Sequence, residues 1–313
     1  MKRRVLILGG TGAMGIYLVP ELLSLGFEVI VTSRSGKGSD HASLRFVKGN
    51  AHALPFVRDV VDQTHPDAIV DFMSYSTAEF ADRRDFLLAS SSHYLFLSSY
   101  RVFADSSPEP LTERSSRILD VCSDEAYLAT DEYALAKARQ ENLLRESGYN
   151  NWTILRPCIT YSKNRFQLGT LEADTICFRS LQGLPTVMSR EILRKQTTMT
   201  WGGDVAKMIA RLVMHPSALS EDYNVVTAEH RSWQEIASVY QEIIGLQIAE
   251  TDIEAYSKVA GAPYQIQYDR MYNRILDNTK VLQATGLHKS DFRSLHLGLV
   301  EELREFLKHP CYP

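Results

Sequence analysis

The sequence predicts an α/β protein with a doubly wound parallel sheet and a smaller C-terminal lobe. Two observations lead to this fold class. Short apolar runs alternate with amphipathic stretches over the first hundred residues, as in repeated strand–helix units. The connections between them are short, which favours a parallel sheet with helices on both faces. A length of 313 residues fits one large core, or a core with a smaller lobe.

Each strand is predicted from an apolar run and each early helix from an amphipathic stretch. A continuous apolar run is typical of a strand that is buried on both faces of a parallel sheet. Such runs predict strands over residues 5–8, 29–31, 44–47, 68–73, 94–97 and 152–156. Amphipathic stretches predict helices over residues 12–25, 54–64, 79–89 and 125–146, and Gly26 stands where a glycine commonly ends a helix.

Two parts of the chain depart from this alternation. Residues 99–124 hold clusters of Ser, Pro, Asp and Glu, which predict a long surface loop over the carboxyl ends of the strands. After Pro157 the pattern is less regular. It predicts a helix at 204–214, a strand at 224–226, a capping box at Ser232 and Glu235 that opens a helix to Ile244, and a helix at 292–307.

These patterns also predict how the chain is divided. Residues 1–165 are expected to form a dinucleotide-binding domain, and residues 196–228 are expected to pack back on it. The smaller substrate-binding lobe is then formed by residues 166–195 and 229–313.

Composition limits the partners and the compartment. The chain has 34 basic and 38 acidic residues and a formal net charge of −4, which argues against a nucleic-acid partner because such domains usually carry a basic excess. The cysteines lie far apart, without a Cys/His cluster at zinc spacing: they are Cys122, Cys158, Cys177 and Cys311. We therefore expect a reduced, cytoplasmic protein with no metal site. No stretch approaches the roughly 20 apolar residues of a membrane span, so no membrane association is expected.

A glycine motif links the first strand to the first helix. Glycines at positions 9, 12 and 15 follow the strand and open the helix, which is the context in which this spacing binds a dinucleotide. Gly9 allows the tight turn, Gly12 lets the backbone approach a pyrophosphate, and Gly15 lets the helix pack against the sheet. Unpaired N–H groups at the helix N-terminus attract the phosphates. The motif predicts a Rossmann-type cofactor site that includes Gly9, Thr11, Gly12, Ala13, Met14 and Gly15.

The end of the second strand predicts which cofactor binds. Many dinucleotide sites carry Asp or Glu there to hold the ribose hydroxyls, whereas this chain has Ser33 followed by Arg34. The planar guanidinium of an arginine matches the oxygens of a ribose 2′-phosphate. We therefore expect NADP(H) to be preferred and NAD(H) to remain possible. The alternative is that these residues form only a solvated basic loop.

Three further residues predict proton chemistry next to this cofactor. Tyr133 and Lys137 are four residues apart in a predicted helix, so their side chains share one face. Ser99 ends the fifth strand, where the crevice of such a fold opens. A neighbouring ammonium lowers the pKa of a tyrosine, which lets the phenol exchange a proton near neutral pH. Taken alone, Ser99 could equally be a strand-end hydroxyl bonded to the backbone.

Six segments spread over most of the chain match one family pattern: Gly-Gly-Thr-Gly-Ala-Met-Gly (9–15), Phe-Leu-Ser-Ser-Tyr-Arg-Val-Phe (96–103), Pro-Leu-Thr-Glu (110–113), Tyr-Ala-Leu-Ala-Lys-Ala-Arg-Gln-Glu-Asn-Leu-Leu (133–144), Ile-Leu-Arg-Pro (154–157) and Gly-Asp-Val-Ala (203–206). With them the chain resembles the extended short-chain dehydrogenase/reductases, the NAD(P)-dependent epimerase/dehydratase group that acts largely on nucleotide sugars. The resemblance implies that Ser99 orients the reacting oxygen, that Tyr133 is the acid and base, and that Lys137 tunes Tyr133 and binds the nicotinamide ribose. It also implies cofactor contacts from Asn50, Phe72, Met73, Tyr133, Lys137 and Pro157. Finally, it implies a homodimer that pairs through the helix of Tyr133 and a neighbouring helix.

Departures from the family pattern narrow the reaction. Members that dehydrate sugars typically have Thr-Asp-Glu where this chain has Ser99-Tyr100-Arg101, so the acid and base for removing water are missing. Epimerases of the family usually hold NAD through a carboxylate that Ser33 replaces. The expected function is therefore reduction of a keto group on a nucleotide sugar, with Tyr133 as proton donor. The alternatives are a nucleotide-sugar 4-epimerase that acts by transient oxidation, and a non-catalytic dinucleotide- or RNA-binding protein.

Overall fold

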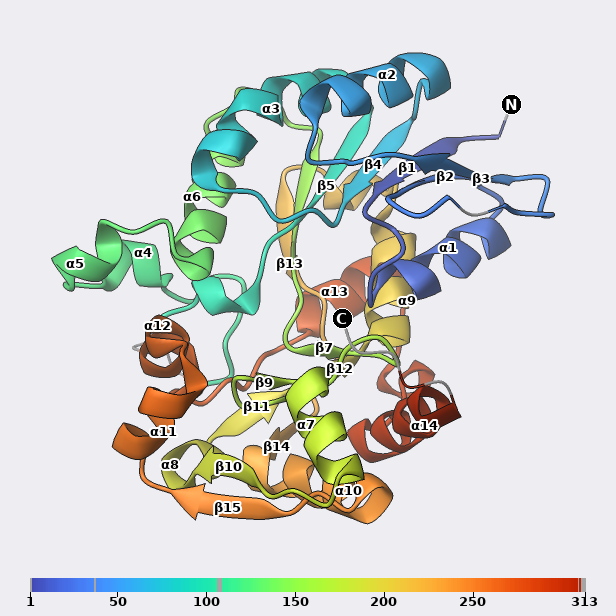
Figure 1. Cartoon of the computed structure of the whole chain (residues 1–313). Coiled ribbons are helices and arrows are strands. Elements are labelled where there is room, and N and C mark those ends of the chain that lie inside the picture. Colours follow the sequence, from blue (N-terminus) through green and yellow to red (C-terminus); the bar gives the residue numbers. More distant parts are fainter. Residues whose placement is uncertain (1, 37, 106–108, 309, 311–313) are drawn as a thin grey trace.

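One seven-stranded sheet forms the centre of the molecule (Figure 1). The computed structural model describes residues 2–36, 38–105, 109–308 and 310. The strands lie in the order β13-β6-β5-β4-β1-β2-β3, and every neighbouring pair is parallel. Their bounds are β1 Arg4–Leu8, β2 Glu28–Ser33, β3 Leu44–Lys48, β4 Ala68–Asp71, β5 His93–Leu97, β6 Trp152–Arg156 and β13 Glu221–Asn224. Because the strand order reverses between β1 and β4, the predicted doubly wound parallel sheet is confirmed.

Helices cover both faces of this sheet (Figure 1). One face carries α1 (Gly15–Ser24) and α9 (Gly202–Leu212), and the other carries α2 (Leu54–Thr64), α3 (Thr77–Ala89) and α6 (Tyr133–Arg145). The side chains of strand β1 show why both faces of the sheet are covered. Val5 and Ile7 belong to the core of the first face, whereas Leu6 and Leu8 belong to the core of the second. A strand covered on both faces is apolar at every position, which is the continuous run seen in the sequence.

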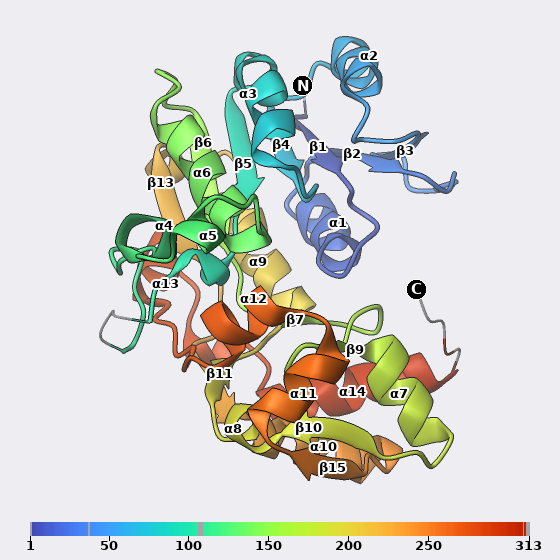
Figure 2. The ribbon, with the colours of Figure 1, turned by 60° about the vertical axis from the view of Figure 1, so that its left-hand side comes forward.

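A second group of elements lies below the carboxyl ends of the strands in Figure 1 and has its own apolar core. Its helices are α7 (Ala173–Leu181), α8 (Arg190–Leu193), α10 (Trp233–Ile244), α11 (Ile253–Ala260), α12 (Pro263–Gln265) and α14 (Leu295–Lys308). Its strands pair as β10 (Thr186–Ser189) with β15 (Ile248–Thr251), β8 (Gln167–Leu168) with β9 (Leu171–Glu172), and β11 (Gln196–Thr198) with β14 (His230–Ser232). Figure 2 shows both groups of elements from a second side. The predicted domain boundaries stay a prediction.

Short elements complete the chain. β7 (Thr160–Tyr161) pairs in parallel with β12 (Thr200–Trp201), and α13 (Thr279–Thr285) contacts α9 and β13. Single 3-10 turns lie at Pro216–Ala218 and Lys289–Asp291, and a π-helical turn covers Ile266–Arg270.

The predicted helix over 125–146 is two helices. α5 covers Glu125–Leu128, and α6 begins at Tyr133. Between them the guanidinium of Arg139 donates hydrogen bonds of 2.6 Å to two backbone carbonyls, which a continuous helix would need for its own bonds. The side chain of Glu132 then caps the new helix by accepting from an N–H of its first turn at 2.8 Å. Tyr133 therefore stands in the first turn of α6.

The predicted loop over 99–124 contains regular structure. It holds the 3-10 turn η1 (Tyr100–Val102) and the short helix α4 (Ile118–Val121). Just before α4, Arg117 donates to the carbonyl oxygen of Ala138 at 3.3 Å, so the segment is tied to α6. As predicted, it also passes the carboxyl ends of strands, because Glu113 accepts at 3.2 Å from Arg156 at the end of β6 and at 2.8 Å from the Asn224 N–H at the end of β13.

The strand predicted over 224–226 begins earlier, at Glu221. Charged residues concealed it in the sequence, because Asp222 lies within the strand and pairs with Arg156 at 2.9 Å and with Arg145 at 3.2 Å. β13 is an edge strand of the sheet, where such side chains are common.

Candidate active site

Two adjoining cavities lie at the carboxyl ends of the strands, where the strand order reverses. The first, here called the inner cavity, has a volume of about 530 Å³ and lies beyond β1, β4, β5 and β6. The second, here called the outer cavity, has a volume of about 520 Å³ and lies beyond β2 and β3. Gly9, Thr11 and Gly12 line both. A dinucleotide laid across this glycine turn would therefore reach both cavities.

The glycine turn has the geometry that a pyrophosphate needs. Gly9 has a φ of +73°, which disfavours a residue with a side chain. A Cβ on Gly15 would lie 2.3 Å from the carbonyl oxygen of Gly10, so the helix could not pack as closely with any other residue. At Gly12 the nearest atom to such a Cβ is 3.8 Å away, so its backbone is open to the cavities. The N-terminus of α1 follows directly, and the residues present fit the phosphates of a dinucleotide.

The outer cavity fits the adenosine end of the cofactor. It is lined by Gly9, Thr11, Gly12, Thr32, Ser33, Arg34, Gly49, Asn50, Ala51, His52 and Met73. Among these described residues there is no Asp or Glu. The cation of Arg34 therefore faces no carboxylate within the lining, and a ribose phosphate entering the cavity would meet no repelling charge.

The three predicted catalytic residues lie together at the inner cavity. Ser99 and Tyr133 line it, and 38% of the Tyr133 surface is exposed. Lys137 is buried one turn further along α6, where its Nζ lies 5.9 Å from the centre of the Tyr133 ring and donates to the carbonyl oxygen of Leu97 at 2.8 Å. No hydrogen bond joins any two of these three described side chains. Ser99 Oγ accepts from the Arg101 N–H at 3.2 Å, and its own proton stays available to a ligand.

Burial sets the protonation of Lys137. The loss of solvent lowers its pKa to about 8, although the charges of Asp71 and Glu141 act in the opposite direction. Asp71 is itself buried, which raises its pKa, but it accepts hydrogen bonds from Tyr94 OH at 2.9 Å and from the Met73 N–H at 2.9 Å. These donors favour the carboxylate form. Lys137 is thus a buried amine held at the bottom of the site, with the carboxyl group of Asp71 behind it.

The structure places the predicted cofactor residues in the lining of the two cavities, with one exception. All of them line the inner or the outer cavity apart from Lys137, which lies beneath the surface of both. The assigned roles stay predictions.

Several residues of the inner cavity were missed by sequence reasoning. They are Ser74, Leu97, Ser98, Tyr100, Arg101, Ile159, Thr160, Asn164, Arg165, Gln167, Glu172, Gln265 and Arg270. Tyr100 and Arg101 were not among the predicted site residues, although the resemblance places them where dehydratases carry their acid and base. The last eight come from segments after β6 that carry no motif, and only the tertiary fold brings them here.

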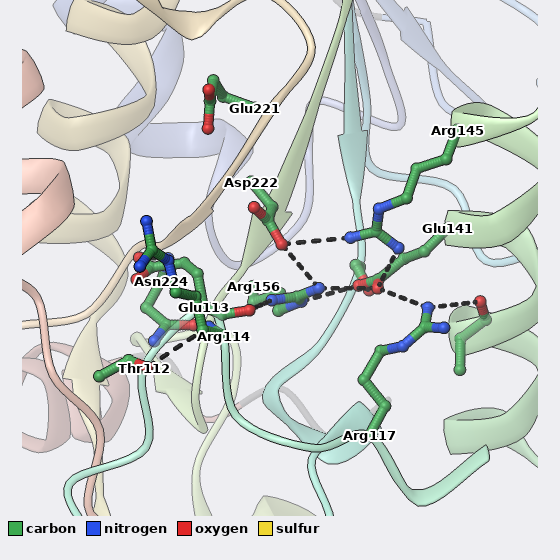
Figure 3. Close-up of polar contacts among 12 residues, drawn as sticks. Thr112, Glu113, Arg114, Arg117, Glu141, Arg145, Arg156, Glu221, Asp222 and Asn224 are labelled. Atoms are coloured by element: carbon green, nitrogen blue, oxygen red, sulfur yellow. Dashed lines mark hydrogen bonds and ion pairs between the residues drawn. The ribbon is translucent and has the colours of Figure 1, made fainter. Parts of the chain in front are cut away.

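A buried ion network supports the strand that ends in Ser98 and Ser99. Figure 3 shows the Glu141 carboxylate among the guanidinium groups of Arg117, Arg145 and Arg156. Arg156 binds it with two hydrogen bonds of 2.8 Å, and Ser98 donates to it at 2.6 Å. Burial would raise the pKa of Glu141, but the attraction of Arg156 and the hydrogen bonds outweigh it and lower that pKa to about 2.

Among the described residues, no group of three or more His, Cys, Asp and Glu side chains could hold a metal ion. Cys122, Cys158 and Cys177 are free thiols, and Cys311 lies outside the described residues. In the same part of the chain, no helix combines the length and apolar character that crossing a membrane requires.

Comparisons with known proteins show which solved structures share this fold and to which family the chain belongs. A search of curated proteins by sequence finds no significant match. Among solved structures, the chain is similar to the Bordetella bronchiseptica enzyme WbmH in complex with NAD+, at 16% identity and a TM-score of 0.75, covering 99% of this chain and 100% of that one. It is also similar to the UDP-glucose 4-epimerase of Thermotoga maritima with UDP-glucose, at 18% identity and a TM-score of 0.70, covering 97% and 99% of the two chains. A third similar structure is the dTDP-glucose 4,6-dehydratase of Bacillus anthracis in complex with NAD. It is 16% identical at a TM-score of 0.72, and the match covers 98% of this chain and 97% of that one.

At these identities the solved structures show a shared fold. A family model gives more, because the NAD dependent epimerase/dehydratase family matches the chain over residues 5–226. That range holds the glycine turn together with Ser99, Tyr133 and Lys137, and it is well over half of the chain. The protein therefore belongs to the NAD dependent epimerase/dehydratase family.

Proposed function

We propose that this protein is an NADPH-dependent reductase of a keto group on a nucleotide-linked sugar. The observation that carries the proposal is that Ser99 and Tyr133 line the same cavity as the glycine turn, with the Lys137 ammonium directly behind them. Bound NADPH would supply the hydride. The nucleotide-sugar substrate is inferred from the family and from the printed names of the similar structures.

The chain's own residues would then manage the proton. Tyr133 OH donates to the carbonyl oxygen of the substrate as that oxygen gains charge. Ser99 donates a second hydrogen bond to the same oxygen, because its lone pair is used by the Arg101 N–H and its proton is not. Lys137 is fixed by the Leu97 carbonyl and stabilises the negative charge that passes through the Tyr133 oxygen.

The two residues that follow Ser99 argue against dehydration of a sugar. Where dehydratases of the family typically carry Asp and Glu, this chain has Tyr100 and Arg101. Tyr100 is buried and its hydroxyl donates to Asp269 at 2.8 Å, so it is not free to act on a sugar. Epimerisation by transient oxidation remains the second candidate, because it uses the same Ser99, Tyr133 and Lys137.

Cofactor consumption separates reduction from epimerisation. With NADPH and a panel of keto-sugar nucleotides, we expect the absorbance of the reduced nicotinamide to fall in proportion to the substrate that is added. An epimerase regenerates its cofactor in each cycle and would leave the absorbance unchanged. A dinucleotide-binding or RNA-binding protein without chemistry would leave both the absorbance and the substrate unchanged.

Arg34 should decide the choice of cofactor. We expect NADPH to bind more tightly than NADH, and Arg34→Ala to remove most of the difference, because a charge-assisted contact to the 2′-phosphate would contribute about 1.5–3 kcal/mol. Titration of both reduced cofactors measures it. Arg45→Ala, at an exposed position of β3 outside the cavity lining, is the matched control and should keep the preference. Equal affinities in the unmodified protein would refute the NADPH preference.

The second group of elements would hold the sugar. We propose that residues 166–195 and 229–313 act as the substrate lobe, because Gln167, Glu172 and Arg270 reach the inner cavity from them. The dinucleotide part would be residues 1–165 together with 196–228.

Pairing of two chains is a further expectation. The proposed homodimer would use the outward faces of α3 and α6, which carry Asp82, Asp85 and Arg139, so its interface would be rich in polar contacts. Light scattering at micromolar concentration should give twice the mass of one chain. The mass of a single chain would contradict the pairing.

A further inference from the structure

A cluster of buried charges forms part of the inner cavity wall beside Tyr133. At its centre is Asp269, whose side chain is completely buried. Arg274 Nε lies 3.0 Å from its Oδ1. Arg270 contacts the other oxygen, Oδ2, as do Arg101 Nε at 3.4 Å and the Tyr100 hydroxyl at 2.8 Å. Arg101 and Arg270 therefore stand side by side on one carboxylate oxygen.

The cluster has one positive charge more than its carboxylates balance. Burial would raise the pKa of Asp269, but the three arginines outweigh it and lower that pKa, so the carboxylate is ionised. Glu132 is the second carboxylate and pairs with Arg101 at 2.6 Å. Three cations thus face two anions. The side chains of Arg270 and Arg274 are only 3% and 2% exposed. A buried cation without a counter-ion is costly, and an anionic ligand would offset that cost.

Two guanidinium nitrogens of the cluster remain for a ligand. Arg274 uses all three of its nitrogens on Asp269 and on two backbone carbonyls. Arg270 uses Nε and Nη1. Arg101 donates a hydrogen bond from Nη2, whereas its buried Nε makes only an ion-pair contact with Asp269 at 3.4 Å. Nη2 of Arg270 and Nη1 of Arg101 have no partner among the described residues, and both arginines line the inner cavity.

The position of these nitrogens relates the anion to the reacting carbon. The guanidinium carbon of Arg101 lies 5.3 Å from the centre of the Tyr133 ring. A group bound by Arg101 would therefore sit within about one sugar ring of the oxygen that Tyr133 protonates. Nearby Glu172 does not repel it strongly, since it faces Arg165 at 3.8 Å.

On the basis of the proposed function, we propose that the sugar to be reduced carries a carboxylate, and that Arg101 and Arg270 bind it. A carboxylate has two oxygens for the two free nitrogens and a single charge that matches the excess of the cluster. Arginine also suits planar carboxylate recognition better than any other cation. The structure thus points to a uronic-acid type of sugar nucleotide.

Binding of two stable probes to the protein saturated with NADP+ tests this proposal. UDP-glucuronic acid and UDP-glucose differ only by a carboxylate in place of a hydroxymethyl group. We expect calorimetry to show tighter binding of UDP-glucuronic acid by about 10- to 100-fold, the range for a charge-assisted contact. Arg101→Gln should remove most of this preference and leave the affinity for UDP-glucose nearly unchanged.

Two controls keep the result interpretable. Arg101→Lys retains the charge and should keep part of the preference, which a variant that only misfolds would not do. Arg190→Gln, a surface change in the lobe that holds Arg270, should keep all of it. Equal affinity for the two probes, or no binding of either at millimolar concentration, would overturn the proposal. Preference for the acid, together with no oxidation of NADPH on any of the keto-sugar nucleotides, would leave the anion site standing and refute only the reduction.

Discussion

Tyr133→Phe should reduce turnover by about 10²–10⁴, the usual contribution of a positioned general acid, with little change in NADPH affinity or melting temperature. Only one hydroxyl is removed, and it has no hydrogen-bond partner among the described residues. The ring is 38% exposed in the first turn of α6, so it contributes little packing that depends on that oxygen. Steady-state kinetics, cofactor titration and thermal melting measure the three quantities on one preparation.

Two companion variants separate chemistry from packing. Lys137→Ala should weaken cofactor binding as well as turnover, because it removes both a buried cation next to Tyr133 and the proposed ribose contact. Ser99→Ala should slow turnover and leave cofactor affinity unchanged. If Tyr133 and Lys137 were only packed helix residues, stability and activity would fall together in both variants. Full turnover in Tyr133→Phe would end the proposed mechanism.

Glu141→Gln should lower the free energy of unfolding by about 3–5 kcal/mol, the range for removing one partner of a buried ion pair. The change keeps the shape of the side chain but leaves Arg156, which is 1% exposed, with only Asp222 as a charged partner. It also weakens the bond that Ser98 donates next to Ser99. Urea denaturation measures the loss.

A matched surface pair provides the control. Glu254 and Lys258 form an exposed pair at 3.3 Å, and Glu254→Gln should change stability by less than about 0.5 kcal/mol. The pH dependence has a defined sign. Because the pKa of Glu141 is lowered from 4.5 to about 2 in the folded protein, its contribution is complete above pH 4.5 and is lost as the pH falls toward 2. An equal loss of stability in Glu141→Gln and Glu254→Gln would mean that the buried ion network around Glu141 stabilises the fold no more than an exposed ion pair does.

Local patterns were sufficient to predict most of the sheet and half of the site. The continuous apolar runs gave the inner strands, and the glycine spacing gave the turn, because both are read within a few residues. The pair Tyr133 and Lys137 was found in the same way. Each of these features depends on residues that are close together in the sequence, so a single sequence is enough to recognise it.

Long-range contacts explain what the sequence could not predict. The break before α6 depends on Arg139 reaching back to carbonyls of the preceding helix, and β13 depends on Arg156 and Arg145 to balance Asp222. The charged wall of the inner cavity joins Arg101 to Arg270 through a shared carboxylate. No spacing rule connects residues so far apart, so that part of the site is visible only in the fold.

The central claim is that hydride passes from NADPH to a sugar carbonyl without return. The most direct measurement uses NADPH carrying deuterium at the transferable C4 position, together with a keto-sugar nucleotide, and follows the product by mass spectrometry. The account predicts that the sugar gains the deuterium and that one NADP+ forms for each sugar reduced. Unlabelled sugar with an inverted centre and unchanged cofactor would contradict it.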